Sequence, residues 1–224
     1  MNVEDALRKR RSIRAFRPDA IPFATVREIL EIASRAPSST NIQPWNVHVV
    51  TGEARRELVE AILAHRENNP SDASAEFAMA DWRREPFLAR MKKLGKDMYG
   101  LLEIAKGDQQ AMWDQWGRNY KFFDAPVGMI FSMDKDLDFM NYIDLGILMQ
   151  SIALVAESRG IGVCMHGAWH DFWSVTKRVL DIPDSQYVVV GMSLGYVDDG
   201  AAVNRLVTER EPVENFVRFH GFAQ

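Results

Sequence analysis

The stretch at positions 138–159 constrains the fold of this 224-residue chain more than any other part of the sequence. It reads DFMNYIDLGILMQSIALVAESR, and it predicts one long helix that stops at Gly160, a residue suited to a helix C-terminus. Apolar side chains fall on nearly every side of this helix: Tyr142, Ile143, Leu145, Ile147, Leu148, Ile152, Leu154 and Val155. We expect such a helix to be buried in a core or in an interface, because it has no polar face to turn toward water.

Shorter predicted elements surround this helix in a mixed order. We expect strands at 45–51, 125–133, 161–165 and 187–192, and helices at 3–9, 23–35, 53–67 and 172–181. Positions 76–120 read as helical, with interruptions at Pro86 and at several glycines. No linker, repeat or low-complexity segment divides the chain, so the sequence predicts one domain, 1–224, of the α+β class.

The composition excludes several broad classes of protein. The net charge of −4 argues against a dedicated nucleic-acid binder, and the single cysteine, Cys164, excludes an intramolecular disulfide framework. No apolar run is expected to serve as a membrane helix of about 20 residues, and the charged N-terminus does not resemble a signal peptide. We therefore expect a soluble, cytoplasmic protein with no nucleic-acid or membrane partner.

A basic stretch near the N-terminus, RKRRSIRAFR at positions 8–17, places six cations in ten residues. Arg10, Arg11 and Arg14 flank the hydroxyl of Ser12, and guanidinium groups with a hydroxyl are what a phosphate monoester requires. Two other interpretations stay open, a solvated helix end favoured by the helix dipole and a nucleic-acid-binding arm.

Two further segments carry side chains suited to a ligand. The loop APSSTNIQPW at positions 36–45 offers four small polar side chains between two prolines, and these can hydrogen-bond to a molecule held against them. The 76–120 region is rich in methionine and tryptophan, which indicates either core and subunit contacts or an adaptable lid over a ligand.

The familiar catalytic and metal-binding patterns are missing from the sequence. The glycines at 160–162 and 191–195 do not form a dinucleotide fingerprint, and no Walker sequence occurs. Cys164 and His166 fall on one strand face, but a lone buried thiol is more typical of packing than of catalysis. The histidines show no metal spacing, so we expect no metal site and no side-chain catalytic triad.

Several motifs in fixed order resemble the FMN-dependent nitroreductase family. They are RRSIRAF (10–16), APSSTNIQPW (36–45), ESRGIGVCMHG (157–167), VVVGMSLGY (188–196) and the late REP (210–212). The resemblance implies a nitroreductase-like α+β fold, a central antiparallel sheet flanked by helices, and a homodimer with a domain-swapped C-terminal arm at 200–224. FMN would lie between the two subunits, with NADH or NADPH as the electron donor.

The same resemblance assigns residues to the cofactor. Arg10, Arg11 and Ser12 would bind the FMN phosphate together with Arg210, for which Arg205 is a competing candidate, and Arg14 would contact the ribityl chain or the pyrimidine edge. The flavin itself would lie against Pro37, Ser38, Ser39, Asn41 and Gln43, and against the backbone of Met165, His166 and Gly167.

The region 67–123 is expected to form a helical cover that selects the substrate. Trp113, Trp116, Tyr120 and Phe123 are the candidate substrate contacts. The implied reaction passes electrons from NAD(P)H through flavin to a nitroaromatic or similar small acceptor, with no catalytic side chain required. The alternatives are a reductive dehalogenase or a flavin-destroying enzyme of the same fold, or a non-catalytic flavin-binding dimer.

Overall fold

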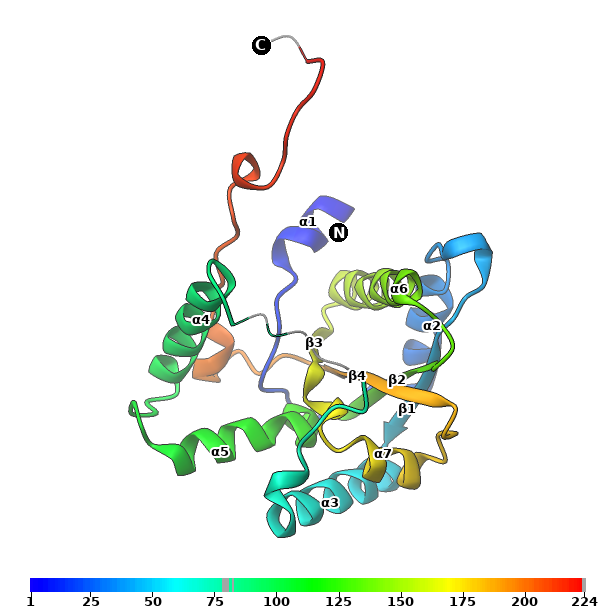
Figure 1. Ribbon diagram of the computed structural model, residues 1–224. Helices are drawn as coiled ribbons and strands as arrows, with labels where there is room; N and C mark the ends of the chain where they lie inside the picture. Colours follow the sequence, from blue (N-terminus) through cyan, green and yellow to red (C-terminus); the bar gives the residue numbers. More distant parts are fainter. Residues whose placement is uncertain (78–80, 82, 223–224) are drawn as a thin grey trace.

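The computed structural model describes residues 1–77, 81 and 83–222, and it shows an antiparallel sheet flanked by helices (Figure 1). The four strands lie in the order β1-β2-β4-β3, and every neighbouring pair is antiparallel. Their bounds are Asn46–Thr51 (β1), Val127–Asp134 (β2), Gly162–His166 (β3) and Gln186–Gly195 (β4). The expected α+β class and all four expected strands are confirmed.

One face of the sheet packs against two helices, α2 (Phe23–Ala33) and α6 (Phe139–Ser158). Alternate residues of β2 point to this side, namely Val127, Met129, Phe131 and Met133. This alternation follows from the two-residue period of a strand, and burial of these side chains supplies the main apolar contact of the core.

The opposite face is covered by α3 (Gly52–Asn68), α7 (Trp173–Leu180) and two short 3-10 turns, η3 (Arg118–Asp124) and η4 (Gly167–His170). Phe122 of η3 stacks on Trp169 of η4, with ring centroids 4.4 Å apart. The sheet accommodates these rings because glycines lie beneath them: a Cβ at Gly191 would lie 2.1 Å from Trp169, and one at Gly128 would lie 2.4 Å from Phe122.

Helix α6 begins at a capping box in which the side chains of Asp138 and Asn141 bond each other's backbone, and it ends before Gly160, whose φ is +72°. One side of α6 packs into the core through Leu145, Leu148 and Ile152, as expected. The other side leaves Phe139, Met140 and Ile143 exposed in the single chain.

Helix α6 corrects one sequence expectation. The sequence was expected to contain no apolar run that could form a membrane helix. Among the described residues, however, α6 is long enough and apolar enough to cross a membrane by length and composition. Much of its surface is nevertheless inside the fold, including the polar side chains of Asn141 and Asp144.

The region expected to be an interrupted helix consists of α4 (Phe87–Leu101) and α5 (Gln109–Gly117), which follow the short turn η2 (Pro70–Asp72). Positions 78–80 and 82 of the expected cover lie outside the described residues. The chain starts with α1 (Val3–Lys9) and ends in a segment that carries two short turns, η5 (Ala202–Arg205) and η6 (Val213–Asn215). In Figure 1 the η5 turn packs against the body of the protein, and the chain beyond it extends away; residues 223–224 lie outside the described residues.

Candidate functional site

The basic stretch begins on α1 and continues along the edge of the sheet. Ser12 pairs with Val163 of β3, where the backbone N–H of Ile13 donates to the carbonyl of Val163 at 2.9 Å. Phe16 then pairs with Val197 beyond the end of β4. Because Ile13 and Phe16 are buried at this edge, the backbone that carries the neighbouring cations is held against the sheet.

A single buried side chain fastens this edge segment to the C-terminal part of the chain. The Oδ1 atom of Asn204 accepts a hydrogen bond from the backbone N–H of Arg14 at 2.8 Å. Its Nδ2 atom donates to the carbonyls of Ala15 at 2.8 Å and Asp198 at 2.9 Å. Asn204 was not among the sequence candidates, because no local pattern marks its bonds to Arg14 and Ala15, which lie 190 and 189 positions earlier.

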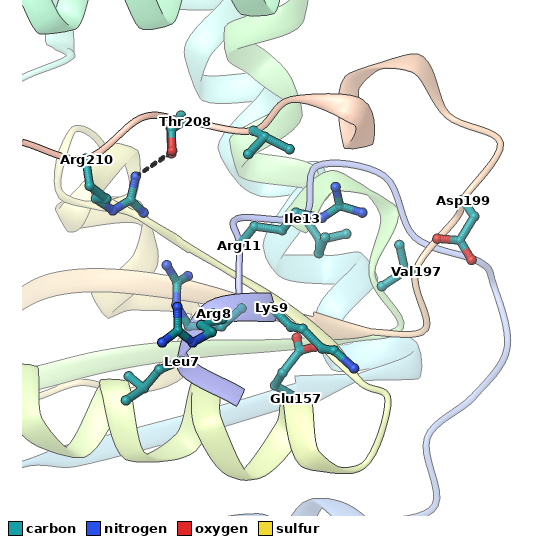
Figure 2. A pocket seen from close by; sticks show the side chains of 12 residues that line it. Leu7, Arg8, Lys9, Arg11, Ile13, Glu157, Val197, Asp199, Thr208 and Arg210 are labelled. Carbon is teal, nitrogen blue, oxygen red and sulfur yellow. Dashed lines mark hydrogen bonds between the residues drawn. The ribbon is translucent and has the colours of Figure 1, made fainter. Parts of the chain in front are cut away.

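A pocket of about 580 Å³ opens beside this edge (Figure 2). It brings Arg10 and Arg11 together with Arg210, which comes from the other end of the chain. The lining also includes the cations Arg8 and Lys9 and only two carboxylates; the full set is Leu7, Arg8, Lys9, Arg10, Arg11, Ile13, Glu157, Val197, Asp199, Val207, Thr208 and Arg210. The site therefore carries an excess of positive charge in an acidic protein.

The cations of the pocket have no acidic partners within the described part of the chain. None of the five forms an ion pair of 4.0 Å or less with a carboxylate there. Converging guanidinium groups without carboxylate partners fit an anion, and their forked donors match phosphate oxygens. This donor set favours the phosphate interpretation over a solvated helix end.

The guanidinium of Arg210 is oriented by its own segment. Its Nη1 atom donates to Thr208 Oγ1 at 2.6 Å, and to the carbonyls of Thr208 and Glu209 at 3.1 and 2.9 Å. Figure 2 shows Arg210 and Thr208 on a segment that borders the pocket. The competing candidate, Arg205, is exposed on η5 and does not line the pocket.

Ser12 and Arg14 lie next to the pocket but not in its lining. The guanidinium Nη1 of Arg14 donates to the carbonyl of Ser12 at 3.5 Å, a long bond. Cys164 is 1% exposed, and burial raises the pKa of its thiol to about 11, so it remains a neutral packing group.

His166 lies at the end of β3 with its side chain inside the core. Trp169 Nε1 donates to His166 Nδ1 at 3.0 Å, so Nε2 carries the proton and donates to Ser193 Oγ at 2.9 Å. Ser193 in turn donates to the carbonyl of Phe122 at 2.8 Å. Burial, with a smaller contribution from the charge of Arg14, lowers the pKa of His166 to about 3 and keeps the imidazole neutral. Gly167 next to it is exposed and Met165 is half-buried.

The loop expected to line the flavin lies at the other end of α6. The backbone N–H of Ser39 donates to Asp144 Oδ1 at 3.0 Å, whereas Glu157 contributes to the pocket. Asp144 and Glu157 are thirteen positions apart on this helix, or about 20 Å at 1.5 Å per residue. A single chain therefore does not bring the candidates of this loop to the cationic pocket; the exposed ones are Pro37, Ser39, Asn41 and Gln43, and Ser38 is half-buried.

The four candidate substrate contacts divide into two pairs. Trp116 of α5 is 49% exposed, and Trp113 stacks under the guanidinium of the buried Arg66, 3.4 Å from the ring centroid. Tyr120 and Phe123 are 0% and 2% exposed, and the Tyr120 hydroxyl donates to Asp171 Oδ2 at 2.8 Å. The structure therefore places the second pair in the core, where no side-chain surface is open to a substrate.

Fold and site together define an α+β protein with a cationic pocket at the edge of an antiparallel sheet. The chain belongs to the nitroreductase family, whose model matches residues 7–196. This confirms the resemblance drawn from the sequence motifs.

Individual relatives agree with this assignment. The chain is 40% identical to a 4-nitrobenzoate reductase of Pseudomonas putida over 95% of this chain and 93% of the relative. It is 34% identical to a chloronitrobenzene nitroreductase of Comamonas testosteroni over 97% and 96% of the two chains. Among solved structures, the FMN and NADPH-dependent nitroreductase NfnB of Sphigopyxis sp. strain HMH superposes with a TM-score of 0.95 at 29% identity, covering 99% of this chain and 100% of the other.

Proposed function

We propose that this protein is an FMN-dependent oxidoreductase that passes electrons from NADH or NADPH, through bound flavin, to a nitroaromatic acceptor. The observation that carries the proposal is the cationic pocket, which joins Arg10 and Arg11 to Arg210 and whose cations form no ion pair with a carboxylate among the residues that the structure describes. Relatives named as reductases of nitroaromatic compounds support the class of acceptor, and a related NfnB structure in complex with NADPH supports the donor.

In this proposal the chain binds and orients the cofactor, and FMN when bound supplies the hydride chemistry. Arg10, Arg11 and Arg210 hold the phosphate by charge-assisted hydrogen bonds, with Ser12 beside them. The backbone of Arg14 is fixed by Asn204, and its charge acts on His166 at the end of β3, so we assign Arg14 to the ribityl chain or the pyrimidine edge. The exposed backbone at Gly167 continues from this strand end.

The proposed working unit is a homodimer in the cytoplasm. The exposed apolar side chains of α6 need a partner surface, and the C-terminal arm carries further exposed apolar residues, Val213, Phe216, Phe219 and Phe222. A second copy would also supply the 37–43 loop, which lies about 20 Å along α6 from the pocket of its own chain. In this arrangement the flavin lies between the two subunits.

The visible spectrum of the purified protein tests the proposal. We expect flavin absorbance that bleaches when NADH or NADPH is added without oxygen and returns when 4-nitrobenzoate is added. Bleaching without recovery would exclude the nitroaromatic acceptor, whereas recovery only with a halogenated aromatic would favour a dehalogenase. A colourless protein that does not bind added FMN would overturn the proposal.

A further inference from the structure

The segment that carries Arg210 contacts the cover helix α4 through two acidic residues. Glu211 Oε2 lies 2.6 Å from Arg90 Nη2, and Glu209 Oε1 lies 3.7 Å from Lys93 Nζ. Asn215 of η6 also donates to the carboxylate of Glu211. In Figure 1, α4 lies beside the η5 turn, immediately before this segment.

From Thr208 to Glu211, residues that line the pocket alternate with residues that pair with α4, and Val207 just before them also lines the pocket. Thr208 and Arg210 line the phosphate pocket, whereas Glu209 and Glu211 pair with α4. Such alternation is the normal result of an extended backbone, in which successive side chains point to opposite sides. A shift of one residue would turn a carboxylate toward the pocket and the guanidinium toward the cations of α4.

We propose that Arg90 and Lys93 are positioning residues for the cofactor phosphate. By pairing with Glu211 and Glu209, they hold the segment in the register that directs Arg210 into the pocket. This inference rests on the proposed function, since it takes the phosphate of FMN as the anion in the pocket. It assigns to the cover helix a part in cofactor binding in addition to its expected part in substrate selection.

A comparison of FMN with riboflavin tests the inference, because riboflavin lacks the phosphate. Flavin-free protein is titrated with each flavin, and the quenching of flavin fluorescence gives the Kd. In Arg90→Glu, which places a carboxylate next to Glu211, we expect the Kd for FMN to rise by about fivefold, since exposed ion pairs are individually weak. The Kd for riboflavin should change by less than about twofold, because Arg210 makes no phosphate contact with it.

Two further variants separate positioning from general damage. The exchange Arg90→Glu with Glu211→Arg restores an opposite-charge pair and should return the Kd for FMN to the wild-type value. Lys92→Glu makes the same charge change on α4, 200° around the helix from Arg90, and should leave both constants unchanged.

The outcomes distinguish this inference from the proposed function. If wild-type protein does not bind FMN, both are overturned. If wild-type protein binds FMN but Arg90→Glu binds it equally well, or loses FMN and riboflavin to the same extent, the positioning role alone is overturned. Failure of the charge exchange to restore binding would also overturn it.

Discussion

At the scale of single residues, the site depends on cations that have no carboxylate partner within the described part of the chain. Most surface cations in proteins are solvated, and an exposed ion pair contributes little to stability. Here Arg10 and Arg11 are half-buried residues near a sheet edge, and the guanidinium of Arg210 is fixed by Thr208. Keeping like charges together costs free energy in the absence of an anion, so anion binding is expected to stabilise the folded protein.

The double variant Arg10→Ala with Arg210→Ala tests this expectation. Charge-assisted hydrogen bonds are strong, so we expect the Kd for FMN to rise by about 100-fold or more, measured by fluorescence titration. The rise in Tm that added FMN gives the wild type should be lost, because a ligand stabilises by mass action. Arg205→Ala is the matched control, since this arginine lies outside the pocket. A larger loss of FMN affinity in the control than in the double variant would assign the phosphate to Arg205 and not to Arg210.

A second residue-scale prediction concerns the buried imidazole of His166. Its pKa is about 3 in the folded protein and 6.5 in its ordinary state, so between these pH values the unfolded chain binds a proton that the folded chain does not. The free energy of unfolding should therefore fall as the pH falls through this window, by about 1.4 kcal/mol per pH unit from this group. His48, whose pKa is also lowered by burial, contributes in the same direction.

Urea unfolding at about pH 5 and about pH 7 measures this dependence. His166→Gln should be less stable than wild type at the higher pH, because it disturbs the bonds to Trp169 and Ser193. It should also lose less stability between the two pH values. An equal loss in both proteins would contradict the inferred neutral state of His166.

At the scale of elements, the two central strands are shaped by the aromatic rings that lie on them. Phe122 and Phe123 have positive φ angles of 54° and 53°, which are unusual for bulky residues. Their side chains nevertheless pack into the core, where Phe122 covers Gly128 and stacks on Trp169. The η3 turn thus depends on close contact with glycines of the sheet.

Gly191→Ala tests this dependence. The added methyl group would overlap the Trp169 ring, and we expect a loss of about 1–3 kcal/mol in the free energy of unfolding, measured with urea. Gly95→Ala on α4 is the matched control, because no atom lies within 4 Å of its added Cβ. The control should instead gain about 0.5–1 kcal/mol from helix propensity, and equal effects in the two variants would contradict the packing argument.

The same elements show what the sequence could predict. The apolar runs of β2 and β4, and the long apolar stretch of α6 that stops at Gly160, were sufficient for those strands, the long helix and the fold class. Phe122 falls within the region that was expected to be helical. Its positive φ could not be foreseen, because tertiary contacts and not local sequence stabilise it. The edge pairing of Ser12 is a single bridge with no period to detect, and the convergence of Arg10 with Arg210 was expected only through the family resemblance. Long-range partners such as Asn204 have no local signal.

At the scale of the whole molecule, a single chain exposes large apolar side chains on α6 and on the C-terminal arm. Phe139 and Ile143 on α6 are 72% and 51% exposed, and the C-terminal arm leaves the body of the protein. Contiguous apolar residues of this kind usually mark an interface, and a stable subunit interface of a permanent dimer covers about 2,000–5,000 Å². Both features agree with the proposed homodimer.

Ile143→Asp tests the proposed interface. A carboxylate within an apolar contact is expensive to bury, so we expect monomers in size-exclusion chromatography with light scattering, and a lower flavin content. Val49→Asp, at an exposed position of the edge strand β1, is the control and should leave the oligomeric state unchanged. A monomeric variant with full flavin content would contradict a site shared between subunits.

The bonds of Asn204 also bear on how the protein is made. Arg14 and Ala15 emerge from the ribosome early, yet the side chain that secures their backbone is translated only near the end, and Arg210 follows it. The nascent polypeptide therefore cannot assemble the proposed phosphate site before Asn204 and Arg210 have been synthesised. A product truncated before position 204 would keep the central strands but would lack both Asn204, which bonds the backbone of Arg14 and Ala15, and Arg210. We therefore expect the cofactor to bind only after the chain is complete.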